Sequence, residues 1–478
     1  MAEVKLSSKH KMTRQNRQEI SSSVAVHSVK EYDLETLVHV VKEAMDLLDS
    51  SVFQNIRSKG KKGLVVLKPN WVQESHEYNH DAWEAVITNP ALLLATILVL
   101  RDRLQGAGTR LVICDGPHTY ANFATIVARG ELRKKVSSLL QQGVNLEILD
   151  LRREIWRRKD QVVVERLKNS EDPRGYVALN LGKHSLLYGH KGEGRFYGAD
   201  YDSGVVNDHH RGERQEYLLA GTAMQCDLFI NLPKMKTHKK TGITCALKNL
   251  VGINGDKNWL PHHTGGNRNH GGDEFLEYGL SQRIERTTKN LGLKLALGFP
   301  MVGTWFYRKT RNAGIRILGD SEKVIRNGNW SGNNTCWRMA LDLNRALLYG
   351  NPDGTWRESG DPKPYLSIVD GVIGGEGNGP LCPDPINSNI LVAGTDPAAI
   401  DAVAARLMGF DPQKLPIVRH AFDSHRWPIS TQNMSTIRVM DDRVGHDIAL
   451  RDIAPSVAGG FTPHFGWNDI RYNRSNDL

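Results

Sequence analysis

The chain has 478 residues, of which 40% are hydrophobic and 24% are charged. A chain of this length can bury a large core without disulfides or metals, and the composition is ordinary for a soluble globular protein. No run reaches the roughly 18 uninterrupted apolar residues that a membrane span needs, because the longest candidate, residues 291–307, contains Lys294 and Pro300. Residues 1–22 are polar and basic and lack the apolar segment of a secretory signal, so we expect a flexible tail.

The formal net charge of +9 is unevenly distributed. Residues 283–326 contain ten Lys or Arg and three Asp or Glu, a local balance of +7. Such a segment favours anionic partners, among them nucleic acid, a membrane surface or a phosphorylated substrate. No zinc finger, RNP motif or basic zipper accompanies it, so a solvated basic insertion is the simpler interpretation. Docking on nucleic acid or an anionic membrane is the alternative.

The five cysteines lie far apart in the sequence and form no C-x-x-C pair. This spacing argues against a disulfide framework, a zinc ribbon and an iron–sulfur cluster held by cysteines alone. We therefore expect a reducing, cytoplasmic location. A redox partner protein with a bound cluster is the weakest of the alternatives.

Short runs rich in Val, Ile and Leu predict buried strands. In chain order they lie near Val24, Leu64, Leu111, Leu146, Leu228, Leu366 and Ile390. Apolar spacing and end signals predict helices within 33–48, 89–108 and 395–410, and a fourth after Asn333 in which Arg338 could pair with Asp342.

The alternation of these strands and helices predicts an α/β fold with a mostly parallel, doubly wound sheet and helices on both faces. We expect one domain over residues 23–478. Long polar or basic insertions at about 151–220 and 255–335 would interrupt it, the first of them irregular.

Polar side chains follow five of the predicted strands directly. They are Lys68 and Asn70, then Asp115 and His118, then Lys234, Lys236 and His238, then Asp370, Glu376 and Asn378, and finally Asp396. In open α/β sheets, ligands bind outside the carboxyl ends of the strands. A single polar ending would indicate a turn, but five together predict a shared binding crevice.

The residue types predict roles in that crevice. The lysines Lys68, Lys236 and Lys248 would bind a phosphate or carboxylate, and Asn70, Asn249 and Asn378 would orient it. Proton transfer would fall to His238, Asp370 and Glu376, and a divalent cation would bind Asp115 and Asp396.

Structural interpretations compete with these roles. Asp115 and Asp370 each precede a glycine, which is typical of a turn, and Asp396 is placed to cap a helix. We expect Lys239 and Lys240 to be solvated charges.

Two glycine-rich segments carry weaker signals. Residues 261–275 contain His262, His263 and His270, whose imidazoles suit zinc, iron or manganese. They match no regular ligand motif such as H-E-x-x-H, so a substrate-covering loop or an ordinary polar loop are the alternatives. Residues 374–380, GGEGNGP, resemble a phosphate-cradling loop in their glycines and match no P-loop pattern.

Several of these segments together resemble the "domain of unknown function 362" family. The blocks are KPNW, CDGPH, INLPKMKTH followed by TGITCALKNLVG, IVDGVIGGEGNGP, and AGTDPAAIDAVAARLMGF, in the family's order and over about residues 60–420. The resemblance implies a prokaryotic-type, mostly cytoplasmic α/β protein and specifies no reaction. Some relatives carry a ferredoxin-like module with cysteine clusters, which this sequence lacks. The lysine–histidine block is also loosely similar to part of nickel-dependent lactate racemase.

We therefore predict an enzyme that binds a small anionic metabolite, phosphorylated or carboxylated, at the carboxyl edge of the sheet. Its chemistry would be acid–base, with a divalent metal as an optional cofactor. A non-catalytic binding or assembly protein is the main alternative.

Overall fold

The computed structural model describes residues 24–473, apart from 160–161, 201 and most of 278–323. The predicted tail at 1–22 and nearly all of the basic segment 283–326 lie outside the described residues.

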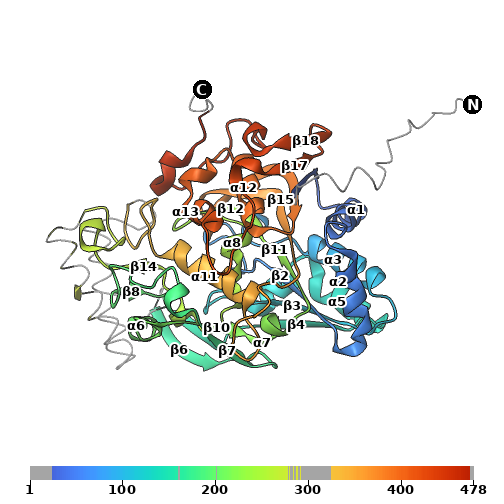
Figure 1. Cartoon of the computed structure of the whole chain (residues 1–478), viewed down its shortest axis with the longest axis horizontal. Helices are drawn as coiled ribbons and strands as arrows, with labels where there is room; N and C mark the ends of the chain where they lie inside the picture. The colour runs from blue at the N-terminus through green and yellow to red at the C-terminus, as the bar shows by residue number, and fades with distance from the viewer. Residues whose placement is uncertain are drawn as a thin grey trace, which may run out of the picture.

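An 11-stranded sheet forms the centre of the fold (Figure 1). Nine of its strands run in the order β18-β17-β1-β16-β15-β11-β2-β3-β4. In chain order these are β1 (Val24–Ser28), β2 (Leu64–Pro69), β3 (Arg110–Asp115), β4 (Leu146–Asp150), β11 (Leu228–Leu232), β15 (Tyr365–Asn378), β16 (Cys382–Gly394), β17 (Arg438–Asp441) and β18 (His446–Ala449). The five strands from β15 to β4 are parallel, whereas β16 is antiparallel to both β15 and β1. Two further strands, β12 (Lys234–His238) and β13 (Gly242–Thr244), extend the sheet beside β15.

The sheet is buried on both faces, as the near-continuous apolar strands predicted. In β2, Val65 and Leu67 pack into one core, and Leu64 and Val66 pack into another on the opposite face. Figure 1 shows the early helices gathered on one side of the sheet. They are α1 (Leu34–Met45), α2 (Ser50–Ser58), α3 (Pro90–Arg103), α4 (Phe123–Ala128) and α5 (Leu132–Gln141).

The opposite face is covered mainly by helices from later in the chain. They are α7 (Gly221–Gln225), α8 (Ala246–Asn249), α11 (Cys336–Tyr349), α12 (Pro397–Leu407) and α13 (Pro416–Arg419). The predicted helix starts are confirmed, since the side chains of Asn89 and Asp396 accept hydrogen bonds from the first turns of α3 and α12. The doubly wound α/β fold is therefore confirmed.

The segment 151–220 is more regular than expected. It contains the antiparallel hairpin of β5 (Glu154–Lys159) and β6 (Val162–Lys168), and a small sheet of β7 (Tyr176–Asn180), β10 (Arg214–Ala220) and β9 (His210–Arg211). The short strand β8 (Phe196–Tyr197), which precedes α6 (Ser203–His209), pairs with β14 (His263–Thr264). The β8–β14 pairing joins residues from both predicted insertions, which local polarity could not indicate.

The glycines of 374–380 do not form a phosphate-cradling loop. Gly374 to Asn378 belong to β15 and pair with β16 in an antiparallel ladder. No helix in the described ranges is long and apolar enough to cross a membrane.

Candidate anion-binding site

The site lies where the strand order of the sheet reverses. From β2 the chain continues to β3 and β4 on one side, then returns to β11 and β15 on the other. In doubly wound sheets the crevice at this switch point is the usual ligand site. A cavity of about 360 Å³ is lined by residues that follow β2, β3 and β11.

Positive charge dominates the cavity wall. Its basic and acidic residues are six lysines, four histidines and two aspartates: Lys68, Lys236, Lys239, Lys240, Lys248, Lys257, His118, His238, His262, His263, Asp115 and Asp200. The predicted polar strand ends Lys68, Asn70, Asp115, Lys236 and His238 are thus brought together, and Lys248 and Asn249 join them.

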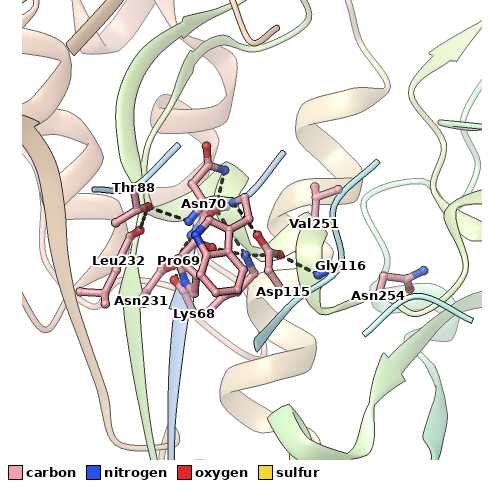
Figure 2. A network of polar contacts seen from close by, with 12 residues as sticks. Lys68, Pro69, Asn70, Thr88, Asp115, Gly116, Asn231, Leu232, Val251 and Asn254 are labelled. Carbon is pink, nitrogen blue, oxygen red and sulfur yellow. Dashed lines mark hydrogen bonds and ion pairs between the residues drawn. The ribbon is translucent and has the colours of Figure 1, made fainter. Parts of the chain in front are cut away.

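Figure 2 shows the buried ion pair at the base of the site, between Lys68 at the end of β2 and Asp115 at the end of β3. Its Nζ and Oδ1 atoms lie 2.7 Å apart. The Asp115 carboxylate also accepts the backbone N–H groups of Trp71, at 2.7 Å, and Gly116, at 2.8 Å. Each charge is therefore satisfied within the protein. Asp115 is the ion-pair partner of Lys68 and not the metal ligand that the sequence predicted.

Gly252 allows this ion pair to form. A Cβ atom at this position would lie 1.8 Å from Asp115 Oδ1 and 2.6 Å from Lys68 Nζ. The backbone carbonyl of Gly252 accepts the Gly116 N–H at 2.8 Å, so the two chain segments meet closely. A side chain here would displace both charged groups.

Three asparagines form a buried ladder beside the ion pair. Asn70 Nδ2 donates to Asn249 Oδ1 at 2.7 Å, and Asn249 Nδ2 donates to Asn231 Oδ1 at 2.7 Å. Asn231 in turn donates to the Ala246 carbonyl at 3.0 Å and to the Tyr365 hydroxyl at 2.8 Å. Because each amide is held by its neighbour, the ladder fixes β2, β11 and α8 relative to one another.

The short helix α8, which carries Lys248 and Asn249, is held from two other elements. The Asp401 carboxylate of α12 accepts the Ala246 N–H at 2.7 Å and the Leu247 N–H at 3.1 Å. Asn344 Nδ2 of α11 donates to the Leu247 carbonyl at 2.8 Å. Burial raises the pKa of Asp401 to about 8. These contacts fix the backbone from which Lys248 reaches the cavity.

Lys248 differs from the other buried lysines of the wall. It is 6% exposed, and its ammonium makes no hydrogen bond or ion pair with any described residue. Burial lowers its pKa, the interaction with Cys336 partly opposes this shift, and the charge of Lys68 adds to it. By contrast, Lys236 donates to the carbonyl of Val86 and, at 3.2 Å, to that of Pro380. Burial also lowers the pKa of Lys236 well below its usual range.

The hydrogen bonds of two histidines define their tautomers. His238 Nδ1 accepts the Lys240 backbone N–H at 3.0 Å, so the proton of its neutral ring lies on Nε2. His262 Nδ1 donates to the Leu260 carbonyl at 2.8 Å, which leaves Nε2 as an acceptor. Burial, reinforced by the charge of Lys248, lowers the pKa of both rings well below the ordinary value. The site therefore contains one neutral imidazole donor and one neutral imidazole acceptor.

Lys239 and Lys240 were predicted to be solvated charges, but the structure places them in the cavity wall. Both are half-buried and line the cavity, and Lys240 donates to the Asn327 carbonyl. Lys257 is also part of the wall, and burial lowers its pKa to about 8.

Several predicted site residues lie away from this cavity. The Asp370 carboxylate is fully buried against Lys234, at 2.8 Å. Glu376 accepts the Thr462 N–H at 2.6 Å, and Asn378 is exposed in the β15–β16 hairpin. Asp396 caps α12 and accepts the Ser430 hydroxyl at 2.5 Å, so the helix-cap interpretation holds.

The predicted metal ligands are not brought together. His262 and His263 line the cavity, whereas His270 bonds to Asn267 outside it. Across the ranges that the structure describes, no group of three or more His, Cys, Asp or Glu side chains is arranged to hold a metal ion. The predicted Arg338–Asp342 pair is also replaced, because Arg338 bonds to Asn334 and the Leu186 carbonyl.

Some residues that build the candidate site were not predicted from the sequence. Asn231 and Asp401 had a readable signal, since each is a polar residue inside an apolar strand or an alanine-rich helix. Lys257 gave none, because it begins the short 3-10 helix η7 (Lys257–Trp259) and reaches the cavity only through tertiary folding.

The sequence profile of the family described as "Domain of unknown function (DUF362)" matches residues 65–406. The chain belongs to this family. The matched range runs from β2 to α12 and includes every residue of the cavity wall. The thylakoid-associated protein sll1697 of Synechocystis sp. (strain ATCC 27184 / PCC 6803 / Kazusa) is 42% identical over 53 residues. These residues are 11% of this chain and 16% of that relative, so the similarity covers a small part of each protein.

Proposed function

We propose that the cavity binds a small metabolite through a phosphate or carboxylate group. The observation that carries this proposal is Lys248, a buried cation on the wall without a partner among the described residues. A buried charge is costly unless an opposite charge or hydrogen bonds compensate it. One of the two aspartates on the wall is already paired with Lys68, so a bound anion would supply the missing negative charge.

The two histidines favour an enzyme over a simple binding protein. His238 offers a proton at Nε2, and His262 offers a lone pair at Nε2, both on the wall of one cavity. The neutral donor can donate a hydrogen bond to a substrate that the lysines hold, and the neutral acceptor can take a proton from it. Asp370 and Glu376 have no part in this proposal because they lie elsewhere.

The predicted setting remains compatible with this function. All five cysteines are unbridged and buried, which supports the reducing, cytoplasmic location expected from their spacing. The metal predicted at His262, His263 and His270 has no part in this proposal, because His270 lies outside the cavity that the other two imidazoles line.

Calorimetry with a panel of anions tests the proposal. Inorganic phosphate, citrate, pyruvate and 3-phosphoglycerate are titrated into the wild-type protein and into Lys248→Met, which keeps the aliphatic stem. Removing one charged hydrogen bond should weaken binding by about 1.5–3 kcal/mol, or roughly ten- to a hundredfold. The matched control is Lys134→Met, because the Lys134 side chain is 81% exposed and does not line the cavity. The proposal fails if the wild-type protein binds none of these anions. It also fails if Lys248→Met binds them as tightly as the wild type does.

A further inference from the structure

We propose that Lys248 is a nucleophile that forms an imine with a carbonyl group of the anionic ligand. The substrate class would then be a small keto acid or a phosphorylated aldehyde or ketone. This inference rests on the proposed anion site and adds a covalent step to it.

The contacts of the buried lysines single out Lys248. The ammonium of Lys68 is paired with Asp115 at 2.7 Å, and that of Lys236 donates to two backbone carbonyls. Lys257 also donates to carbonyl oxygens, at 3.3 and 3.5 Å. Such acceptors stabilise the protonated amine and occupy its N–H groups. Among the described residues, Lys248 has no such acceptor, so its nitrogen can lose a proton and present a lone pair to the cavity.

The surroundings of Lys248 suit a reactive amine. A lysine that is desolvated or close to another cation is the usual nucleophile in imine formation. Lys248 meets both conditions, because it is buried and the charge of Lys68 acts on it. The contacts of Asp401 and Asn344 with α8 hold its backbone in one place. The other lysines of the same wall would hold the anionic end of the ligand.

The step balances without any further reactant. The amine of Lys248 adds to the carbonyl carbon, and the carbonyl π electrons move to the oxygen. His238 Nε2–H donates a hydrogen bond to that oxygen, while His262 Nε2 accepts a proton from the nitrogen and returns it to the oxygen. The C–O bond then breaks as the C=N bond forms. Both amine protons leave with the oxygen as one water molecule.

Reductive trapping tests the inference on the full chain. The protein is incubated with pyruvate, dihydroxyacetone phosphate or neutral acetone, and sodium cyanoborohydride then delivers hydride to any imine carbon. Intact mass and peptide mapping locate the resulting secondary amine. We expect a single adduct on the Lys248 peptide with the two anionic carbonyl compounds, much less with acetone, and none in Lys248→Arg. Lys134→Arg should behave as the wild type.

Mapping the wild-type adduct decides the question even if Lys248→Arg fails to fold. An adduct spread over exposed lysines, or no adduct on the Lys248 peptide, overturns the inference. If phosphate and pyruvate still bind by calorimetry in that case, the proposed anion site stands without the covalent step. If no anion binds, both proposals fail together.

Discussion

Two buried lysines close in sequence, Lys234 and Lys248, stand in opposite electrostatic situations. Lys234 lies 2.8 Å from Asp370, whose other oxygen accepts the Tyr32 hydroxyl at 2.8 Å. The Asn89 backbone N–H completes the carboxylate's contacts, also at 2.8 Å. Lys248 has no counterpart of this kind among the described residues.

We infer from this difference that the charge of Lys234 serves folding and that the charge of Lys248 serves the proposed ligand site. The Lys234–Asp370 pair joins β12 to β15 and lies outside the cavity, fully neutralised by its surroundings. Lys248 lines the cavity, and in the proposed site its charge would bind the anionic ligand. The paired lysine should therefore matter for stability and the unpaired one for binding.

The largest effect is expected from Lys234→Met. This change leaves the Asp370 carboxylate buried without its cation, which should lower the free energy of unfolding by about 3–5 kcal/mol. Urea unfolding followed by circular dichroism measures the loss. The double variant Lys234→Met with Asp370→Leu should recover much of it, because both charges are then removed. If Lys234→Met lowers the free energy of unfolding no more than an exposed control such as Lys134→Met, the pair has no structural role.

Much of the fold could be predicted because its signals are local. The apolar runs near Leu64, Leu111, Leu228 and Leu366 became β2, β3, β11 and β15, and the N-caps at Asn89 and Asp396 begin the expected helices. The cavity itself could be predicted, because carboxyl ends of parallel strands meet at one edge of a sheet.

The assignment of charges within the site could not be predicted. Strand periodicity places Lys234 and Lys236 on one face, yet a register shift between them directs the first to Asp370 and the second to the cavity. Asp115 and Asp370 have the same Asp–Gly sequence, and only their tertiary neighbours distinguish them. These contacts join residues 47 positions apart for Lys68 and Asp115 and 136 positions apart for Lys234 and Asp370, so no local pattern encodes them.

A smaller loss of stability is expected from Asp401→Ala. Two buried N–H groups at the start of α8 would lose their acceptor, but the desolvation cost of the carboxyl disappears with it, so we expect a net loss of about 1–3 kcal/mol. Because α8 carries Lys248 and Asn249, anion affinity should fall as well, whereas exposed-surface variants keep both properties. Unchanged affinity in Asp401→Ala would show that α8 does not depend on this carboxylate for its position.

The same residue predicts a dependence on pH. Burial raises the pKa of Asp401 from 3.8 to about 8 in the folded protein, so the folded state binds more protons than the unfolded chain between these values. Its contribution to stability is fully present below the ordinary pKa and is lost as the pH rises to about 8. In Asp401→Asn this contribution is absent. The free energy of unfolding of the wild type, measured in urea relative to that of the variant, should therefore decrease between about pH 5 and pH 8. A relative free energy of unfolding that increases with pH would contradict a raised pKa of Asp401 in the folded protein.

The smallest effect is expected from Lys248→Met in the ligand-free protein. Methionine has a similar volume and removes an unpaired buried cation close to Lys68, so the free energy of unfolding should stay constant or rise by up to about 1 kcal/mol. A loss as large as that of Lys234→Met would show instead that the ammonium is held by a partner within the protein. Saturating phosphate extends the comparison. At a hundred times its Kd it should stabilise the wild type by about 2.7 kcal/mol and the variant by less, because a ligand stabilises only the state that binds it.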